Sequence, residues 1–140
     1  MKIAKEFRWE MGHRLPHHKG LCKNVHGHSY RMIVEVTGDL NGEGMVIDFF
    51  DLDSIVKPIL DKYDHAFLCW ERDNAVKDFL EQENVKSVIA GYQSTVENIC
   101  NDLLNKIHTG IRGTNNNNIK ELSIKVYETP NAFAEQLVKF

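Results

Sequence analysis

The sequence has few cysteines, few prolines and no long apolar run, and these shortages exclude several classes of protein. Three cysteines, an odd number, do not make a disulfide framework, and free thiols are typical of a reducing compartment. Cys69 and Cys100 lie on apolar segments, where we expect them in the core. The first ten residues alternate charged with apolar side chains and contain no apolar stretch of the kind found in secretory signal peptides. We therefore expect a cytoplasmic protein without a membrane segment.

Basic residues are not in excess either, because 17 Lys and Arg stand against 20 Asp and Glu. No basic block is available to neutralise phosphates, so we expect no nucleic-acid partner. The length of 140 residues, with 42% hydrophobic and 26% charged residues, is typical of one soluble domain. We assign residues 1–140 to a single domain.

Two segments with alternating hydrophobicity open the chain. The odd positions of 3–11 and the even positions of 30–36 are mainly apolar, with polar residues between them. A period of two predicts strands, and the pair is expected to be antiparallel. His13 continues the apolar face of the first strand, and His26 and His28 lie on the apolar face of the second strand, at its start. The three histidines should therefore lie together at one end of the strand pair.

A first helix is predicted over 52–63, where apolar residues recur at i, i+3 and i+4. Asp48 or Asp51 can cap its start. Pro58 lies inside the pattern and predicts a kink, because proline removes a backbone hydrogen bond and crowds the preceding turn.

A second helix is predicted over 96–107, and Ser94 with Glu97 forms a capping-box pattern at its start. The polar segment 71–91 between the helices reads as an irregular excursion with a short helix around 74–82.

Two more strands, 119–128 and 132–140, complete the order β-β-α-α-β-β. This order predicts an α+β domain in which the helices cover one face of a four-stranded antiparallel sheet. The exposed edges of such a sheet favour oligomerisation.

The histidines have the spacing of a metal site. His26 and His28 on one face of a strand can reach one ion, and His13 from the neighbouring strand supplies a third imidazole. Three histidines leave the fourth tetrahedral position open, which is the pattern of a catalytic zinc site. Two alternatives stay open: Cys22 is the fourth ligand of a structural zinc, or the histidines are only hydrogen-bonded polar residues.

Three further residues could take part in catalysis or ligand binding. Asp64 beside His65 could orient the imidazole, which could then activate a thiol; the alternative is a local surface pair. Glu128 continues the apolar face of the third strand, where a buried carboxylate could bind a ligand edge with two N–H groups. The alternative is that the strand ends first and Glu128 is solvated.

Taken together, these residues resemble the 6-pyruvoyltetrahydropterin synthase and 6-carboxytetrahydropterin synthase family. The motifs GHRLP, Cys-x3-His-Gly-His, VIDFFDL, DHAFL, STVEN and VYET occur in the family's order. The resemblance implies a tunnelling fold (T-fold), in which ββααββ subunits associate edge to edge into an oligomeric barrel. It also implies a homohexamer made of two trimers, with active sites at the subunit interfaces.

The resemblance assigns roles to the metal-like cluster and its neighbours. Cys22 matches the catalytic base, and Asp64 and His65 match the residues that activate this cysteine from a neighbouring subunit. The matches to the family's Zn²⁺ ligands are His13, His26 and His28.

The resemblance also assigns residues that contact the pterin. Glu128 matches the pterin anchor, which also belongs to the catalytic relay. Thr95 and Glu97 fall in a motif that lines the pterin pocket, where Val96 replaces a second threonine found in some members.

The implied substrate is 7,8-dihydroneopterin triphosphate. The four-residue step from Cys22 to His26 resembles the bacterial 6-carboxy enzymes of the route to 7-deazaguanines such as queuosine, so we expect 6-carboxy-5,6,7,8-tetrahydropterin, acetaldehyde and triphosphate as products. The alternatives are a 6-pyruvoyltetrahydropterin synthase, which keeps the three-carbon side chain, and a zinc-containing pterin or purine binder without turnover.

Overall fold

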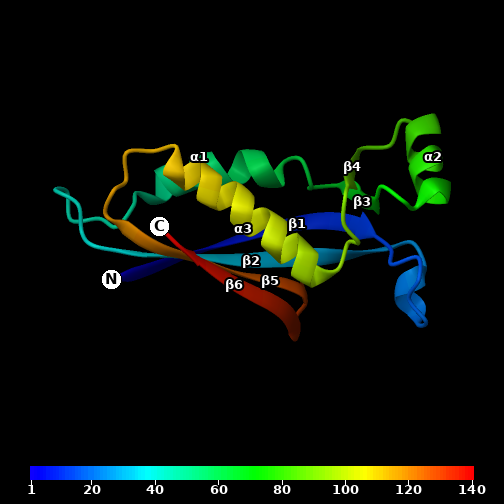
Figure 1. Ribbon diagram of the computed structural model, residues 1–140, viewed down its shortest axis with the longest axis horizontal. Helices are drawn as coiled ribbons and strands as arrows, with labels where there is room; N and C mark the ends of the chain where they lie inside the picture. The colour runs from blue at the N-terminus through cyan, green and yellow to red at the C-terminus, as the bar shows by residue number, and fades with distance from the viewer.

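The protein is described by a computed structural model of residues 1–140, in which two long helices lie across one face of a six-stranded sheet (Figure 1). A third helix lies at one end of the sheet. The strand order is β4-β3-β1-β2-β5-β6. The elements are β1 (Lys2–His13), the 3₁₀ turn η1 (Leu21–Lys23), β2 (His26–Gly38), α1 (Phe49–Leu60), β3 (Ala66–Trp70), α2 (Asn74–Gln82), β4 (Ser87–Ala90), α3 (Val96–Arg112), β5 (Ile119–Thr129) and β6 (Ala132–Lys139).

The first two strands form the antiparallel pair that the alternation predicts. Their register runs without a break from Lys2 opposite Thr37 to His13 opposite His26. The alternate residues on one face of β2 pack beneath the helices, and Val34 is completely buried. Because Met11 pairs with His28, all three candidate ligands lie on this helix-covered face.

The predicted four-stranded antiparallel sheet is correct for β1, β2, β5 and β6 but incomplete. Two short strands, β3 and β4, extend the β1 edge, and both pair parallel to their neighbours, so the sheet is mixed. The run AFLCW of β3 does not alternate, because Leu68 and Cys69 face opposite sides and both are buried. Periodicity cannot separate so short an apolar run from a piece of buried helix.

The interpretation of 71–91 as an irregular excursion is wrong in part. The short helix over 74–82 is confirmed as α2, and residues 87–90 form β4, which pairs with β3. β4 has only four residues, fewer than an average strand, and carries no alternating pattern that would reveal it.

The helix starts agree with the sequence in one case and differ in the other. The carboxylate of Asp48 accepts a hydrogen bond from the Phe50 N–H at 2.7 Å, so Asp48 caps α1 as predicted. The cap of α3 is Thr95 and not Ser94, so the predicted capping box is wrong by one residue. Pro58 lies in the last turn of α1, and the kink there stays a prediction.

A glycine at the end of β2 gives a first testable consequence. A Cβ atom on Gly38 would lie 2.5 Å from the backbone oxygen of Asn118, where the β2–β5 register shifts. We expect Gly38→Ala to lower the free energy of unfolding by about 2 kcal/mol, because backbone must move to relieve the clash. Urea unfolding at fixed protein concentration measures the change.

Gly42 supplies the matched control, since a Cβ atom there would meet nothing within 4 Å. Gly42→Ala should change the free energy of unfolding by less than about 0.5 kcal/mol. Equal urea midpoints for the two variants would show that the backbone at the β2–β5 pair relieves the clash without loss of stability.

Candidate metal and active site

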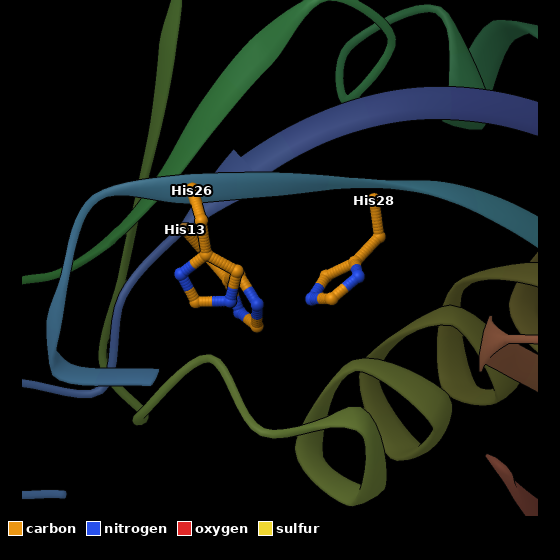
Figure 2. A group of neighbouring side chains, drawn as sticks. All are labelled: His13, His26 and His28. Carbon is orange, nitrogen blue, oxygen red and sulfur yellow. The ribbon is translucent and has the colours of Figure 1, made fainter. Parts of the chain in front are cut away.

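The three candidate metal ligands come from the paired ends of β1 and β2. Their imidazoles project from the same side of the two strands, next to the segment that leads into α3 (Figure 2). One nitrogen from each of His13, His26 and His28 lies within 4.8 Å of the others. The sheet register alone brings these rings together, because His13 is directly opposite His26 and one pleat from His28.

Backbone carbonyls orient two of the rings. Nδ1 of His13 lies 2.7 Å from the Ser94 carbonyl oxygen, and Nδ1 of His26 lies 2.7 Å from the Asn24 carbonyl oxygen. A carbonyl only accepts, so each Nδ1 must carry a proton, and in the neutral ring Nε2 then presents a lone pair. This tautomer is the one in which Nε2 can bind a metal.

The electrostatics favour neutral imidazoles at His13 and His28. Burial lowers the pKa of His13 to about 4, an effect that the hydrogen bond to Ser94 partly offsets. Burial also lowers the pKa of His28. Nε2 of His13 is buried without a hydrogen-bond partner. A buried nitrogen without a hydrogen-bond partner, next to the imidazoles of His26 and His28, fits a bound divalent metal, and three nitrogen ligands suit zinc.

Glu128 lies beside this group, in the irregular step between Tyr127 and Thr129 where β5 and β6 change register. Its Oε1 is 3.4 Å from Nε2 of His13 and 3.8 Å from Nε2 of His28. His13 is neutral at physiological pH, so the shorter contact is not an ion pair. The Glu128 side chain is 24% exposed, so the interpretation that it lies inward is closer to the structure than a fully solvated position.

Tyr30 contacts Glu128 and is a site residue that was not predicted from the sequence. Its hydroxyl points at Oε1 of Glu128 from 3.5 Å, and its ring packs edge-on to His28. Burial, followed by the charge of Glu128, raises the pKa of Tyr30 strongly, so the phenol keeps its proton and can only donate to the carboxylate. The alternation of β2 could have revealed the position, because Tyr30 follows His26 and His28 on the same face.

Cys22 lies outside the histidine group, in η1 of the loop that joins β1 to β2. It is a free, half-buried thiol, whereas Cys69 and Cys100 are fully buried. Burial raises the pKa of both buried thiols to about 11, in agreement with their predicted place in the core. The carbonyl of Cys22 accepts from the Leu15 N–H at 2.8 Å, which closes the loop beside the end of β1.

Nδ1 of His65 lies 3.0 Å from Oδ2 of Asp64 at the start of β3, which pairs with the end of β1. The backbone of Glu10 holds both residues, since its N–H donates to Asp64 Oδ1 and its carbonyl accepts from the His65 N–H. His65 has a φ of +55°, a left-handed conformation that is uncommon for residues other than glycine. The imidazole is 75% exposed and is directed outward.

The hydrogen bond from Glu10 and the neighbouring His65 lower the pKa of Asp64. The carboxylate is therefore charged at physiological pH and can orient an imidazole.

Thr95 and Glu97 occupy the first turn of α3. Thr95 is half-buried and its hydroxyl accepts from the Asn98 N–H at 3.4 Å, next to the Ser94 carbonyl that holds His13. Glu97 is exposed and lines a separate hollow between α3 and β6. Thr95 therefore adjoins the residue that binds His13, whereas Glu97 faces a different hollow.

A hollow of about 610 Å³ opens beside His28 and Glu128. Arg8 and Arg31 also line it, and both guanidinium groups bind the carboxylate of Glu6. Its size suits a small ligand, and its walls offer both a carboxylate and cationic groups. A groove of similar size between α1 and α3 contains none of the predicted site residues.

No helix of the protein combines the length and the apolar composition of a membrane-spanning segment. The sequence profile of the family described as 6-pyruvoyl tetrahydropterin synthase matches residues 2–137. A Haemophilus influenzae protein named 6-carboxy-5,6,7,8-tetrahydropterin synthase is 39% identical, and the alignment covers 96% of each chain. A Rickettsia conorii protein of the same name is 29% identical over 96% of this chain and 99% of its own.

The structure resembles that of 6-pyruvoyl tetrahydropterin synthase from Plasmodium falciparum, with a TM-score of 0.82 and 22% sequence identity. The superposition covers 100% of this chain and 98% of the other. At this identity the likeness shows a shared fold.

Proposed function

Because the chain belongs to the 6-pyruvoyl tetrahydropterin synthase family and has its tunnelling fold, we propose that it is a zinc-dependent lyase acting on 7,8-dihydroneopterin triphosphate. The proposed products are 6-carboxy-5,6,7,8-tetrahydropterin, acetaldehyde and triphosphate. The observation that carries the proposal is the group of three imidazoles beside the carboxylate of Glu128. The relatives named 6-carboxy-5,6,7,8-tetrahydropterin synthase favour this product over the 6-pyruvoyl one.

His13, His26 and His28 would hold the zinc. Bound there, zinc would supply Lewis-acid stabilisation of charge on the side-chain oxygens of the substrate. The protein's own contribution at this point is orientation, since the Ser94 and Asn24 carbonyls fix two of the imidazoles.

Glu128 would recognise the pterin ring. A charged carboxylate can accept two parallel hydrogen bonds from adjacent N–H groups, as it does from guanidinium. Tyr30 donates toward the same carboxylate and so limits its orientation. The half-buried Thr95 lies at the start of α3, where its hydroxyl could contribute to the wall of the pterin pocket.

Cys22 would be the base that removes a proton from the substrate side chain. Its activating partner would be His65 of a neighbouring copy, with Asp64 holding that imidazole. The 75% exposure of the His65 side chain supports action across a subunit interface. A homohexamer of two trimers would provide such interfaces.

Mass spectrometry of the products tests the proposal, after zinc-loaded protein is incubated with 7,8-dihydroneopterin triphosphate. We expect 6-carboxytetrahydropterin and acetaldehyde, which would agree with a cytoplasmic enzyme of 7-deazaguanine (queuosine) biosynthesis. 6-Pyruvoyltetrahydropterin as the product would assign the chain to the family's other reaction. Pterin binding without any turnover would instead indicate a non-catalytic zinc-containing pterin or purine binder.

A further inference from the structure

Ser94 connects the end of β1 to the segment before α3 through both its side chain and its backbone. Its hydroxyl donates to the Arg14 carbonyl at 3.1 Å, and its carbonyl accepts from His13 Nδ1 at 2.7 Å. Two consecutive residues of β1 and its extension are therefore held by one serine. Ser94 is completely buried, so no water competes for these bonds.

The side chain of Arg14 extends this connection to the segment before α2. Its guanidinium forms two hydrogen bonds of 2.6 Å with the two carboxylate oxygens of Asp73. Asp73 is 6% exposed, and a bidentate pair of this kind fixes both position and direction. Since Arg14 directly follows His13, this ion pair restrains the backbone from which the His13 imidazole projects.

We propose that Ser94 and the Arg14–Asp73 ion pair are positioning residues for the metal ligand His13. The inference rests on the proposed zinc site and extends it to residues that touch neither metal nor substrate. Without the restraint, the His13 ring would rotate about its side-chain bonds and lose the orientation in which Nε2 faces the other two imidazoles.

Zinc affinity tests the proposal directly. The dissociation constant is measured at one pH by competition with a chromogenic chelator for the wild type, Ser94→Ala, Arg14→Lys and Asp73→Asn. Ser94→Ala keeps the carbonyl that binds His13 and removes only the hydroxyl bond to Arg14. We therefore expect this variant and the two ion-pair variants each to weaken zinc binding roughly 3- to 10-fold, at or just below the range typical of residues that orient a metal ligand. The visible absorption of the cobalt(II)-loaded proteins should change in parallel, because it reports ligand geometry.

Tyr63→Phe is the matched control. The Tyr63 hydroxyl donates to Asp102 at 2.6 Å in another buried polar network, which makes no contact with the histidines. This variant should lose thermal stability but keep zinc affinity within about twofold, because the bond that it removes does not orient a ligand. Ser94→Thr, which keeps the hydroxyl, should bind zinc more tightly than Ser94→Ala.

The double variant Ser94→Ala with Asp73→Asn should weaken zinc binding by less than the product of the two single effects. Both changes act through the backbone of Arg14, and coupled residues are not additive. The exposed fraction of the Arg14 side chain is 25%, so Arg14→Lys should fold even if Ser94→Ala does not.

Zinc affinities of the three single variants within twofold of the wild type, with unchanged cobalt spectra, would overturn the positioning role and leave the proposed site intact. An equal loss in Tyr63→Phe would also overturn it. A wild-type protein that binds no zinc would overturn the proposed site and this inference together.

Discussion

Replacing Cys22 by alanine should leave zinc bound and lower turnover by about 10²- to 10⁴-fold, the usual effect of removing a general base. The thiol lies outside the group of metal-ligating atoms that the three histidines form, so the metal should not depend on it. Two measurements are needed on the same preparation: zinc content by atomic absorption, and the rate of triphosphate release from 7,8-dihydroneopterin triphosphate.

Cys69→Ala is the control for loss of a thiol. Cys69 is buried in β3 with a pKa raised to about 11, so it is protonated at physiological pH and should not contribute to turnover. If Cys22→Ala lost zinc along with activity, Cys22 would be a fourth ligand, and the closed structural site that the sequence leaves open would be the better interpretation.

The half of the fold that the sequence predicts well is the half with regular periodicity. β1 and β2 alternate over their whole length, and the face that carries Met11 and Tyr30 in the sequence is the face buried in the structure. The parallel strands β3 and β4 were not predicted, because one is covered on both faces and the other has only four residues.

The candidate site shows the same division. The histidines could be grouped from sequence because strand pairing converts their spacing into proximity. The role of Ser94 could not, since its contact with His13 is made by a backbone carbonyl that every residue possesses. The sequence instead predicts Ser94 as a helix cap, a role that Thr95 takes while the Ser94 hydroxyl binds Arg14.

The missed part of the fold and the missed part of the site are connected. Asp73 lies between β3 and α2, so the ion pair with Arg14 exists because the unpredicted strand β3 pairs with β1 and leads into α2. His65, whose backbone is left-handed, directly precedes β3, and the Glu10 carbonyl accepts a hydrogen bond from its N–H. Segment 64–90 therefore contains both Asp73, which pairs with Arg14, and His65, the proposed partner of Cys22, although its own sequence shows little regular pattern.

Replacing His28 by alanine should abolish tight metal binding. A structural zinc site in a folded peptide has an apparent binding free energy of roughly 10–16 kcal/mol shared by four ligands, so losing one imidazole should weaken zinc binding by about 10²-fold or more. The side chain of His28 is 21% exposed, and its removal should cost less stability than removal of the fully buried His13. Chelator competition at fixed pH measures the affinity, and turnover should fall with the metal content.

His18→Ala is the control for loss of an imidazole, because His18 is exposed in the loop between β1 and β2 and lies outside the metal-ligating group. Its zinc affinity should equal that of the wild type. If His28→Ala bound zinc as tightly as His18→Ala, the metal would lie elsewhere, and the three imidazoles would be hydrogen-bonded residues without a metal role. A loss confined to His28→Ala would assign the ion to the paired ends of β1 and β2, where the strand register brings the three imidazoles together.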